Sequence, residues 1–190
     1  MKLLVGRKFK DQDVQVELSK SPFKAVELSN GGVGISILYN DEPLVISAEH
    51  AMAMMLVKAK DTSAKANGNL NIADSVLAVP QWFTESQRRG ILQACEIASL
   101  NCLKVTNESC AIALSYGIFK SAKKLFSETE PQHVMFVDIG YTSYCVTIVD
   151  FIQVRIYLIC YDDGDIMINM MMAIIWHFKE TSQIKSKSNS

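Results

Sequence analysis

The segment FVDIGYTSYCV, residues 136–146, places a carboxylate, a glycine and two hydroxyl side chains close together. Asp138 interrupts an apolar run, Gly140 permits a tight turn, and Thr142 and Ser143 follow the turn. Backbone amides and hydroxyls suit phosphate oxygens, and a carboxylate suits the magnesium ion that accompanies a phosphate. The segment therefore predicts either a phosphate clamp in which Asp138 is linked to magnesium, or an ordinary hairpin with aspartate as a turn residue.

A second carboxylate, Glu108, follows a short apolar run and precedes a helical pattern. It can take part in catalysis, or it can simply stabilise the positive N-terminal end of that helix. His50, His133 and His177 are too far apart in sequence for the spacing of metal ligands. The motifs GxSxG, HExxH and GxxxxGK[ST] do not occur in the sequence. The chemistry therefore depends on the two carboxylates.

The five cysteines form no CxxC pair and lie in apolar segments: Cys95, Cys102, Cys110, Cys145 and Cys160. This pattern is typical of buried, reduced thiols in a cytosolic protein, and the alternative is a metal or redox site. The apolar run at residues 166–176 is shorter than the roughly 20 residues that a membrane-spanning helix needs. The apolar start at residues 3–5 is too short for a signal peptide. We therefore expect a soluble, cytoplasmic protein.

The formal net charge of -1 provides no basic field for nucleic acid or for an anionic membrane, so neither is expected as a partner. Hydrophobic periodicity and turn residues predict strands at residues 14–18, 33–39, 44–46, 75–80 and 103–105, on both sides of Gly140, and at 154–160. Helices are expected after the cap residue Ser47, after the capping box that begins at Thr84, and over residues 109–120, with a loop at 121–132. This mixture indicates an α/β fold with antiparallel additions.

Four longer stretches occur in the order found in heat shock protein 70 chaperones, and together they resemble that family: residues 5–9 (VGRKF), 77–91 (LAVPQWFTESQRRGI), 100–120 (LNCLKVTNESCAIALSYGIFK) and 136–149 (FVDIGYTSYCVTIV). The resemblance covers most of residues 1–160. The pieces LNCL, SYGIFK and FVDIGYTSY are similar to the large, one-hundred-ten branch, whose members act as nucleotide-exchange factors on their smaller relatives. The smaller chaperones carry three glycines where this chain has Gly140, Tyr141 and Thr142.

The resemblance implies an α/β fold of the actin-like ATPase type. Two ribonuclease-H-like lobes, with mixed sheets and flanking helices, would close on ATP or ADP and Mg²⁺. By this resemblance the chain divides into a remnant of a peripheral lobe-one subdomain (1–46), the core of lobe one (47–125), the start of lobe two with a phosphate loop (126–179) and a disordered tail (180–190).

The resemblance also implies the roles of individual residues. Three residues would offer backbone amides to the β- and γ-phosphates: Gly140, Tyr141 and Thr142. Asp138 would hold magnesium through water, and Glu108 would orient that water shell. Lys2 would lie near the γ-phosphate, and Pro80 would link the nucleotide state to the rest of the molecule.

The sequence also departs from the family pattern. The first phosphate loop, a DLGT-like hairpin, would lie before Lys2, and IMINMM at residues 166–171 replaces a GGxxFD segment. Bulky side chains there would keep the backbone away from phosphate. Cys145 takes the position of a second aspartate in the smaller chaperones. We therefore expect a chain that is incomplete at both ends, ATP affinity that is millimolar or weaker, and no useful hydrolysis.

Three functional hypotheses remain. The first is an ATP-binding chaperone or co-chaperone domain that assists protein folding. The second is a non-enzymatic module that contacts smaller heat shock protein 70 chaperones. The third is an inactive remnant that binds no nucleotide, in which exposed sheet edges and apolar surface would favour aggregation.

Overall fold

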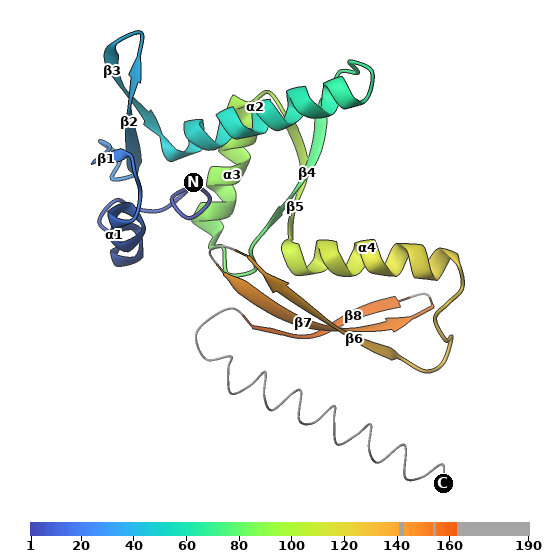
Figure 1. The fold of residues 1–190 in the computed structure, drawn as a ribbon. Coiled ribbons are helices and arrows are strands. Elements are labelled where there is room, and N and C mark those ends of the chain that lie inside the picture. The colour runs from blue at the N-terminus through green and yellow to red at the C-terminus, as the bar shows by residue number, and fades with distance from the viewer. Residues whose placement is uncertain (141–142, 154, 163–190) are drawn as a thin grey trace. The chain divides into compact units, whose positions relative to one another are not determined.

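A computed structural model describes residues 1–140, 143–153 and 155–162 (Figure 1). Its elements follow one another in the order α1 (Gln12–Ser19), β1 (Lys24–Glu27), β2 (Val33–Tyr39), β3 (Glu42–Ser47), α2 (Ala48–Ala66), β4 (Asp74–Val79), α3 (Glu85–Ile97), β5 (Asn101–Asn107), α4 (Glu108–Ala122), β6 (Gln132–Ile139), β7 (Tyr144–Ile152) and β8 (Arg155–Asp162). The predicted mixed α/β fold is confirmed.

The chain divides into two compact units, Met1–Asn107 and Glu108–Ser190. The first unit contains the antiparallel sheet β1-β2-β3 and the parallel pair β4-β5, and the second contains the antiparallel sheet β6-β7-β8. In this division α4 belongs with the last sheet. The subdomain boundaries expected after residues 46 and 125 stay predictions, and residues 163–190, including the expected tail, lie outside the described residues.

The strand expected at residues 14–18 is wrong, because this segment lies in the helix α1. Val14 is buried, whereas Val16 is 47% exposed, so the two valines do not share a buried strand face. Val14 and Leu18, four positions apart, both contribute to the first core, as the spacing of a helix requires. A five-residue run is too short for its periodicity to separate a helix from a strand.

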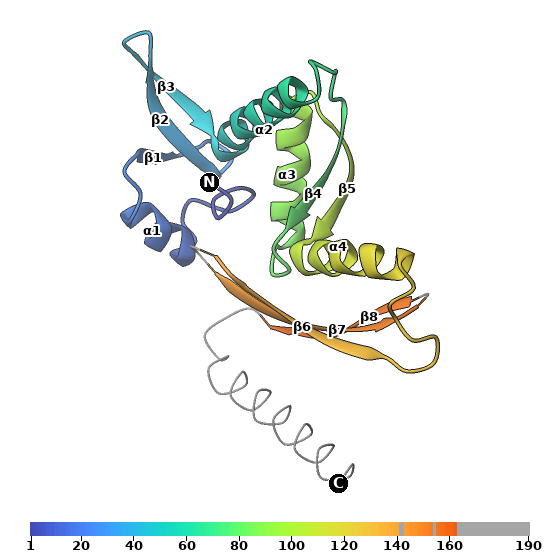
Figure 2. The same cartoon turned by 45° about the vertical axis from the view of Figure 1, so that its right-hand side comes forward.

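Capping residues fix where the two long helices of the first unit begin. The Ser47 side chain accepts a hydrogen bond from the His50 amide at the start of α2. Thr84 and Gln87 form the predicted capping box at the start of α3, in which the Thr84 amide donates to Gln87 Oε1. In both ribbon views α2 and α3 lie on the same side of β4 and β5 (Figure 2). The predicted strand–helix–strand order is confirmed.

The backbone of Gly6 holds the N-terminal segment of the first unit against α2 and α3. The Ser86 hydroxyl donates to the Gly6 carbonyl at 2.7 Å, and the Gly6 amide donates to Glu49 of α2 at 3.0 Å. A Cβ atom at Gly90 would lie 2.7 Å from Val5 Cγ1 and 3.1 Å from the Gly6 nitrogen. A glycine in α3 therefore permits this close approach. The segment helps to form the first core, which includes Leu4, Val5, Val14, Val33, Val79, Phe83 and Ile91.

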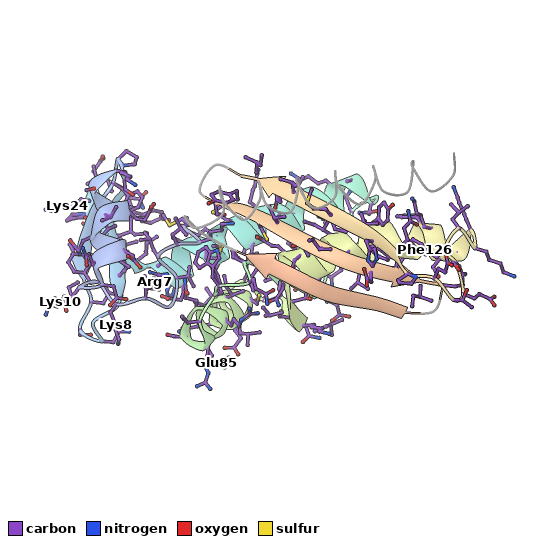
Figure 3. The ribbon with its side chains drawn as sticks, turned by 90° about the horizontal axis from the view of Figure 1, so that it is seen from below. Arg7, Lys8, Lys10, Lys24, Glu85 and Phe126 are labelled. Carbon is purple, nitrogen blue, oxygen red and sulfur yellow. The ribbon has the colours of Figure 1, made fainter. Side chains whose placement is uncertain are left out.

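In the second unit, α4 covers one face of the three-stranded sheet. The core of this unit contains Ala113, Phe126, Val149 and Phe151, with Tyr116, Val134 and Phe136 packed against it. The rings of Phe126 and Phe151 are stacked, with centroids 5.1 Å apart. Figure 3 labels Phe126 beside the sheet. The predicted hairpin of β6 and β7 is confirmed, and the run expected to pair at 154–160 does so in β8 from Arg155 onward, residue 154 lying outside the described residues.

Candidate functional site

Asp138 lies near the end of β6, on the side of the sheet that faces α4. Its partner across the hairpin is Cys145, and the preceding pair on the same face is Phe136 with Thr147. Residues two apart in a strand point to the same face. Because Phe136 packs edge-to-face on Tyr116 of α4, Asp138 is directed to that same side, one step beyond the core. Its side chain is exposed there.

Glu108, the first residue of α4, lies toward the same end of the sheet as Asp138. Two hydrogen bonds fix the other end of α4. The Ser121 hydroxyl donates to the Gln153 carbonyl at 2.8 Å, and the Gln153 side chain donates to the Ser121 carbonyl at 2.9 Å. Since Gln153 follows β7, α4 runs in the direction of β7, and its first turn lies toward the hairpin end (Figure 1). Both predicted carboxylates therefore belong to one end of one unit.

The turn that follows Asp138 is closed by its own backbone. The Gly140 amide donates to the Ser143 carbonyl at 2.9 Å, and a Cβ atom at Gly140 would lie only 3.2 Å from that oxygen. A side chain at position 140 would therefore crowd the turn. Tyr141 and Thr142 lie outside the described residues. The expectation that the amides of residues 140–142 face a phosphate stays a prediction, and the Gly140 amide already has a partner in the turn.

Lys2 and Pro80 belong to the first unit. Lys2 is half-buried in the turn that precedes Leu4 and Val5. Pro80 is buried directly after β4, and its carbonyl accepts a hydrogen bond from the Phe83 amide. The structure thus places Lys2 and Pro80 in one unit, and Glu108 and Asp138 in the other. Their predicted roles stay predictions.

Arg88 is a residue whose position the sequence patterns did not reveal. Its guanidinium group donates to the Asn107 side chain at 2.7 Å and to the Phe83 carbonyl at 3.2 Å. It therefore connects the segments that follow β4 and end β5. The next residue, Arg89, instead forms an exposed pair with Glu85, which Figure 3 labels on α3. The sequence signal for this position is the pair of consecutive arginines, Arg88 and Arg89, near the start of a helix. Consecutive residues of a helix point in different directions, so only one of the two arginines can lie on the outer face.

The chemistry of the donor set limits which ion this end of the sheet can hold. Within the part of the chain that the structure describes, no group of three or more His, Cys, Asp or Glu residues could hold a metal ion. Mg²⁺ bound with phosphates keeps several waters and needs only one or two carboxylates from the protein. Asp138 supplies one, and its neighbour Cys145 contacts the Thr147 hydroxyl at 3.6 Å. These residues fit a hydrated Mg²⁺ shared with phosphates, and they do not fit an all-protein cage.

Comparison with known proteins places these elements within one family. Residues 1–156 match the family model described as Hsp70 protein. The 97 kDa heat shock protein of Strongylocentrotus purpuratus is 39% identical over 150 residues, which make up 79% of this chain and 17% of that protein. Human Heat shock 70 kDa protein 4L is 37% identical over 150 residues, covering 79% of this chain and 18% of that protein.

Heat shock 70 kDa protein 4 of Rattus norvegicus is 38% identical over 146 residues, which make up 77% of this chain and 17% of that protein. The chain therefore spans less than a fifth of the length of these relatives. Among the described residues, no helix combines the length and the apolar character that crossing a membrane requires.

Proposed function

The chain belongs to the Hsp70 protein family, and from this membership we propose that it binds a magnesium–nucleotide complex at the hairpin of β6 and β7. The observation that carries the proposal is the position of Asp138. It lies on the face covered by α4, two residues before Gly140 and at the end of the sheet toward which Glu108 lies. The hairpin lies within residues 1–156, which match the family.

Each residue of the proposed site has a distinct task. Asp138 would hold Mg²⁺ through water, since an exposed carboxylate can accept hydrogen bonds from the water shell of the ion. Glu108 would orient other waters of that shell, and the turn at residues 140–142 would face the phosphates. The role of Lys2, which lies in the other unit, stays a prediction of the resemblance. When bound, Mg²⁺ supplies the positive charge that neutralises the phosphate oxygens.

We further propose that ATP hydrolysis is slow or absent. Cys145 lies directly across the hairpin from Asp138, so the cross-strand position carries a thiol and no second carboxylate. A neutral thiol is a poor ligand for Mg²⁺, which prefers oxygen. The site would then have one carboxylate on this pair of strands, which is enough to hold Mg²⁺ together with phosphates. It would lack the second acidic group that the resemblance assigns to the smaller chaperones.

Titration with Mg-ADP and Mg-ATP, followed by NMR chemical shifts because the expected affinity is millimolar or weaker, tests the site. We expect Asp138→Asn to weaken nucleotide binding by roughly 10- to 100-fold in Mg²⁺, as loss of an outer-shell partner typically does, and to change it little in EDTA. Glu130→Gln, an exposed carboxylate in the loop before β6, is the matched control and should bind as the unmodified chain does. Equal affinities for the unmodified chain and Asp138→Asn in Mg²⁺ would exclude this role for Asp138.

We also propose a more specific function than nucleotide binding. The chain would act on smaller heat shock protein 70 chaperones, as a nucleotide-exchange factor of the large branch would. Its support is the similarity to the 97 kDa heat shock protein and to Heat shock 70 kDa protein 4. The test is the release of a fluorescent ADP analogue from a smaller chaperone, with and without this chain, and a pull-down in competition with a full-length exchange factor. If the release of the ADP analogue is unchanged and the pull-down retains no chaperone, the proposed action on smaller chaperones is excluded. The proposed nucleotide site is not affected by that result.

A further inference from the structure

Two cysteines that are far from any CxxC pattern are neighbours in the first unit. Cys95 lies near the end of α3 and is 1% exposed. Cys102 lies in β5 and is partly exposed. Cys102 packs against the apolar cluster that contains Cys95, and the neighbouring Cys102 thiol contributes to the raised pKa of Cys95. The other described cysteines, Cys110 and Cys145, lie in the second unit.

The end of α3 returns the chain to Cys95. The Leu100 amide donates to the Cys95 carbonyl at 2.9 Å, and the Ser99 amide donates to the Glu96 carbonyl at 3.0 Å. Ser99 has a positive φ of 53°. This pair of bonds around a left-handed residue is a Schellman motif, which reverses the chain at a helix end. The motif holds the Leu100 amide against the Cys95 carbonyl, and Cys102 follows two residues after Leu100.

The surroundings of the pair give the two thiols different accessibility. Burial, together with the neighbouring Cys102 thiol and the Glu96 carboxylate, raises the pKa of Cys95 to about 12. From α2, the residues packed on this cluster are Met52, Ala53 and Leu56, which carry no charge. The nearby cation of α2, Lys60, donates to the Ser99 carbonyl at 3.0 Å. Cys102 is therefore the thiol that a soluble reagent meets first.

We propose that Cys95 and Cys102 form a reversible intramolecular disulfide when the chain meets a small-molecule disulfide such as glutathione disulfide. In the first step the Cys102 thiolate attacks one glutathione sulfur, which forms a mixed disulfide and releases one glutathione thiolate. In the second step Cys95 loses its proton and its sulfur attacks the Cys102 sulfur, which releases the second glutathione. Two protein thiols are oxidised, and one glutathione disulfide is reduced to two glutathione molecules.

The disulfide would join the end of α3 covalently to β5, in a unit that contains neither Asp138 nor Glu108. The modification site is therefore independent of the proposed nucleotide site. Its effect on the structure would be local, because only the short segment from residue 95 to residue 102 is closed by the new bond. Since burial keeps Cys95 protonated, the closing step should be faster at alkaline than at neutral pH.

Mass spectrometry of the full chain after incubation with glutathione disulfide tests the proposal. Trypsin should release residues 90–104 as one peptide that contains both cysteines. We expect this peptide to be lighter by two hydrogen atoms than its reduced form, to resist alkylation, and to regain both thiols after reduction. Chymotryptic cleavage after Leu100 should give two pieces that stay linked until a reductant is added.

Variants of single cysteines identify each step. Cys95→Ser should stop at a glutathione adduct on Cys102, Cys102→Ser should leave Cys95 unmodified, and the control Cys110→Ser should still form the bond. Circular dichroism shows whether each variant is folded, and Cys95→Ala is the substitute if Cys95→Ser is not. In the chain without substitutions, two results would overturn the proposal. One is a glutathione adduct that persists on Cys102, and the other is a disulfide from Cys95 or Cys102 to Cys110 or Cys145.

Discussion

At the scale of single residues, the buried Cys95 thiol makes the stability of the first unit depend on pH. Its pKa is about 12 in the folded chain against an ordinary value of 9.0, because burial, Cys102 and Glu96 all disfavour the thiolate. Above pH 9.0 the unfolded chain therefore loses this proton while the folded chain retains it. The contribution of Cys95 is complete below pH 9.0 and is lost as the pH rises toward about 12.

We therefore expect the free energy of unfolding to fall between pH 9 and about pH 12, with a slope from this one group of up to about 1.4 kcal/mol per pH unit. Urea unfolding under reducing conditions measures the slope. Cys95→Ala should flatten it, because alanine does not titrate, and Cys110→Ala should leave it unchanged. Identical slopes for the unmodified chain and Cys95→Ala would contradict the expectation.

At the scale of elements, the hairpin of β6 and β7 puts two side chains in direct opposition. Replacing Cys145 by aspartate would place a second carboxylate across from Asp138. We expect Cys145→Asp to destabilise the chain by about 1 kcal/mol without divalent ions, because like charges repel when they lie directly opposite in a sheet. Millimolar Mg²⁺ should recover that loss by binding between the carboxylates.

Urea unfolding with Mg²⁺ and with EDTA measures both effects. Cys145→Asn is the matched control, since it also removes the thiol contact with Thr147 but adds no charge. Its stability should not respond to Mg²⁺ more than that of the unmodified chain. If Cys145→Asp and Cys145→Asn behave alike in both conditions, the two strand positions do not share an ion.

The elements that the sequence predicted well are those with a local signal. Ser47 and Thr84 marked the starts of α2 and α3, and a glycine marked the hairpin that carries Asp138. The pattern at residues 14–18 predicts a strand where the structure has α1, because the two valines alternate over a run too short to define a period. The neighbouring thiols could not be predicted, because Ser99 supplies the left-handed turn that glycine usually signals.

The candidate site shows the same division. Asp138 and Glu108 were found from residue type and from their place beside predicted strands and helices. Their common position at one end of a unit depends on the direction of α4, which the contact between Ser121 and Gln153 establishes. The role of Arg88 depends on which face of α3 it occupies. Contacts between residues distant in sequence leave no trace in local periodicity, so these features required the structure.

At the scale of the whole molecule, two units with separate cores should respond separately to mutations in those cores. Gly90→Ala would drive a methyl group into Val5 and the backbone of Gly6, at an expected cost of about 1–3 kcal/mol to the first unit. Phe151→Ala would remove a fully buried ring from the second core, at an expected cost of about 3–5 kcal/mol.

Two measurements check this expectation: the thermal unfolding transition of the chain, and the hydrogen-exchange protection of each unit. Gly90→Ala should lower protection in Met1–Asn107 and Phe151→Ala in Glu108–Ser190, so that each variant serves as the control for the other. A single cooperative transition that both mutations shift equally would show that the units unfold together. It would also argue against the hypothesis of an inactive remnant, which predicts broad unfolding.

The outer face of β4 and β5 bears on the same hypothesis. Val76 is 58% exposed and Leu103 is 63% exposed, although parallel strands usually have both faces covered. Such apolar exposure favours association. We expect a charged residue at one of these positions, such as Leu103→Lys, to raise the concentration at which the chain stays monomeric, as sedimentation velocity can measure.

The contact between Ser86 and the Gly6 carbonyl has a consequence for how the chain is made. The two residues are 80 positions apart, and ribosomes add about 5–20 residues per second, so roughly 4–16 s separate their synthesis. During that interval Leu4 and Val5 have left the peptidyl-transferase centre, but α3, which later packs against them, does not yet exist. The apolar segment around Leu4 and Val5 would thus be synthesised several seconds before the helix that buries it.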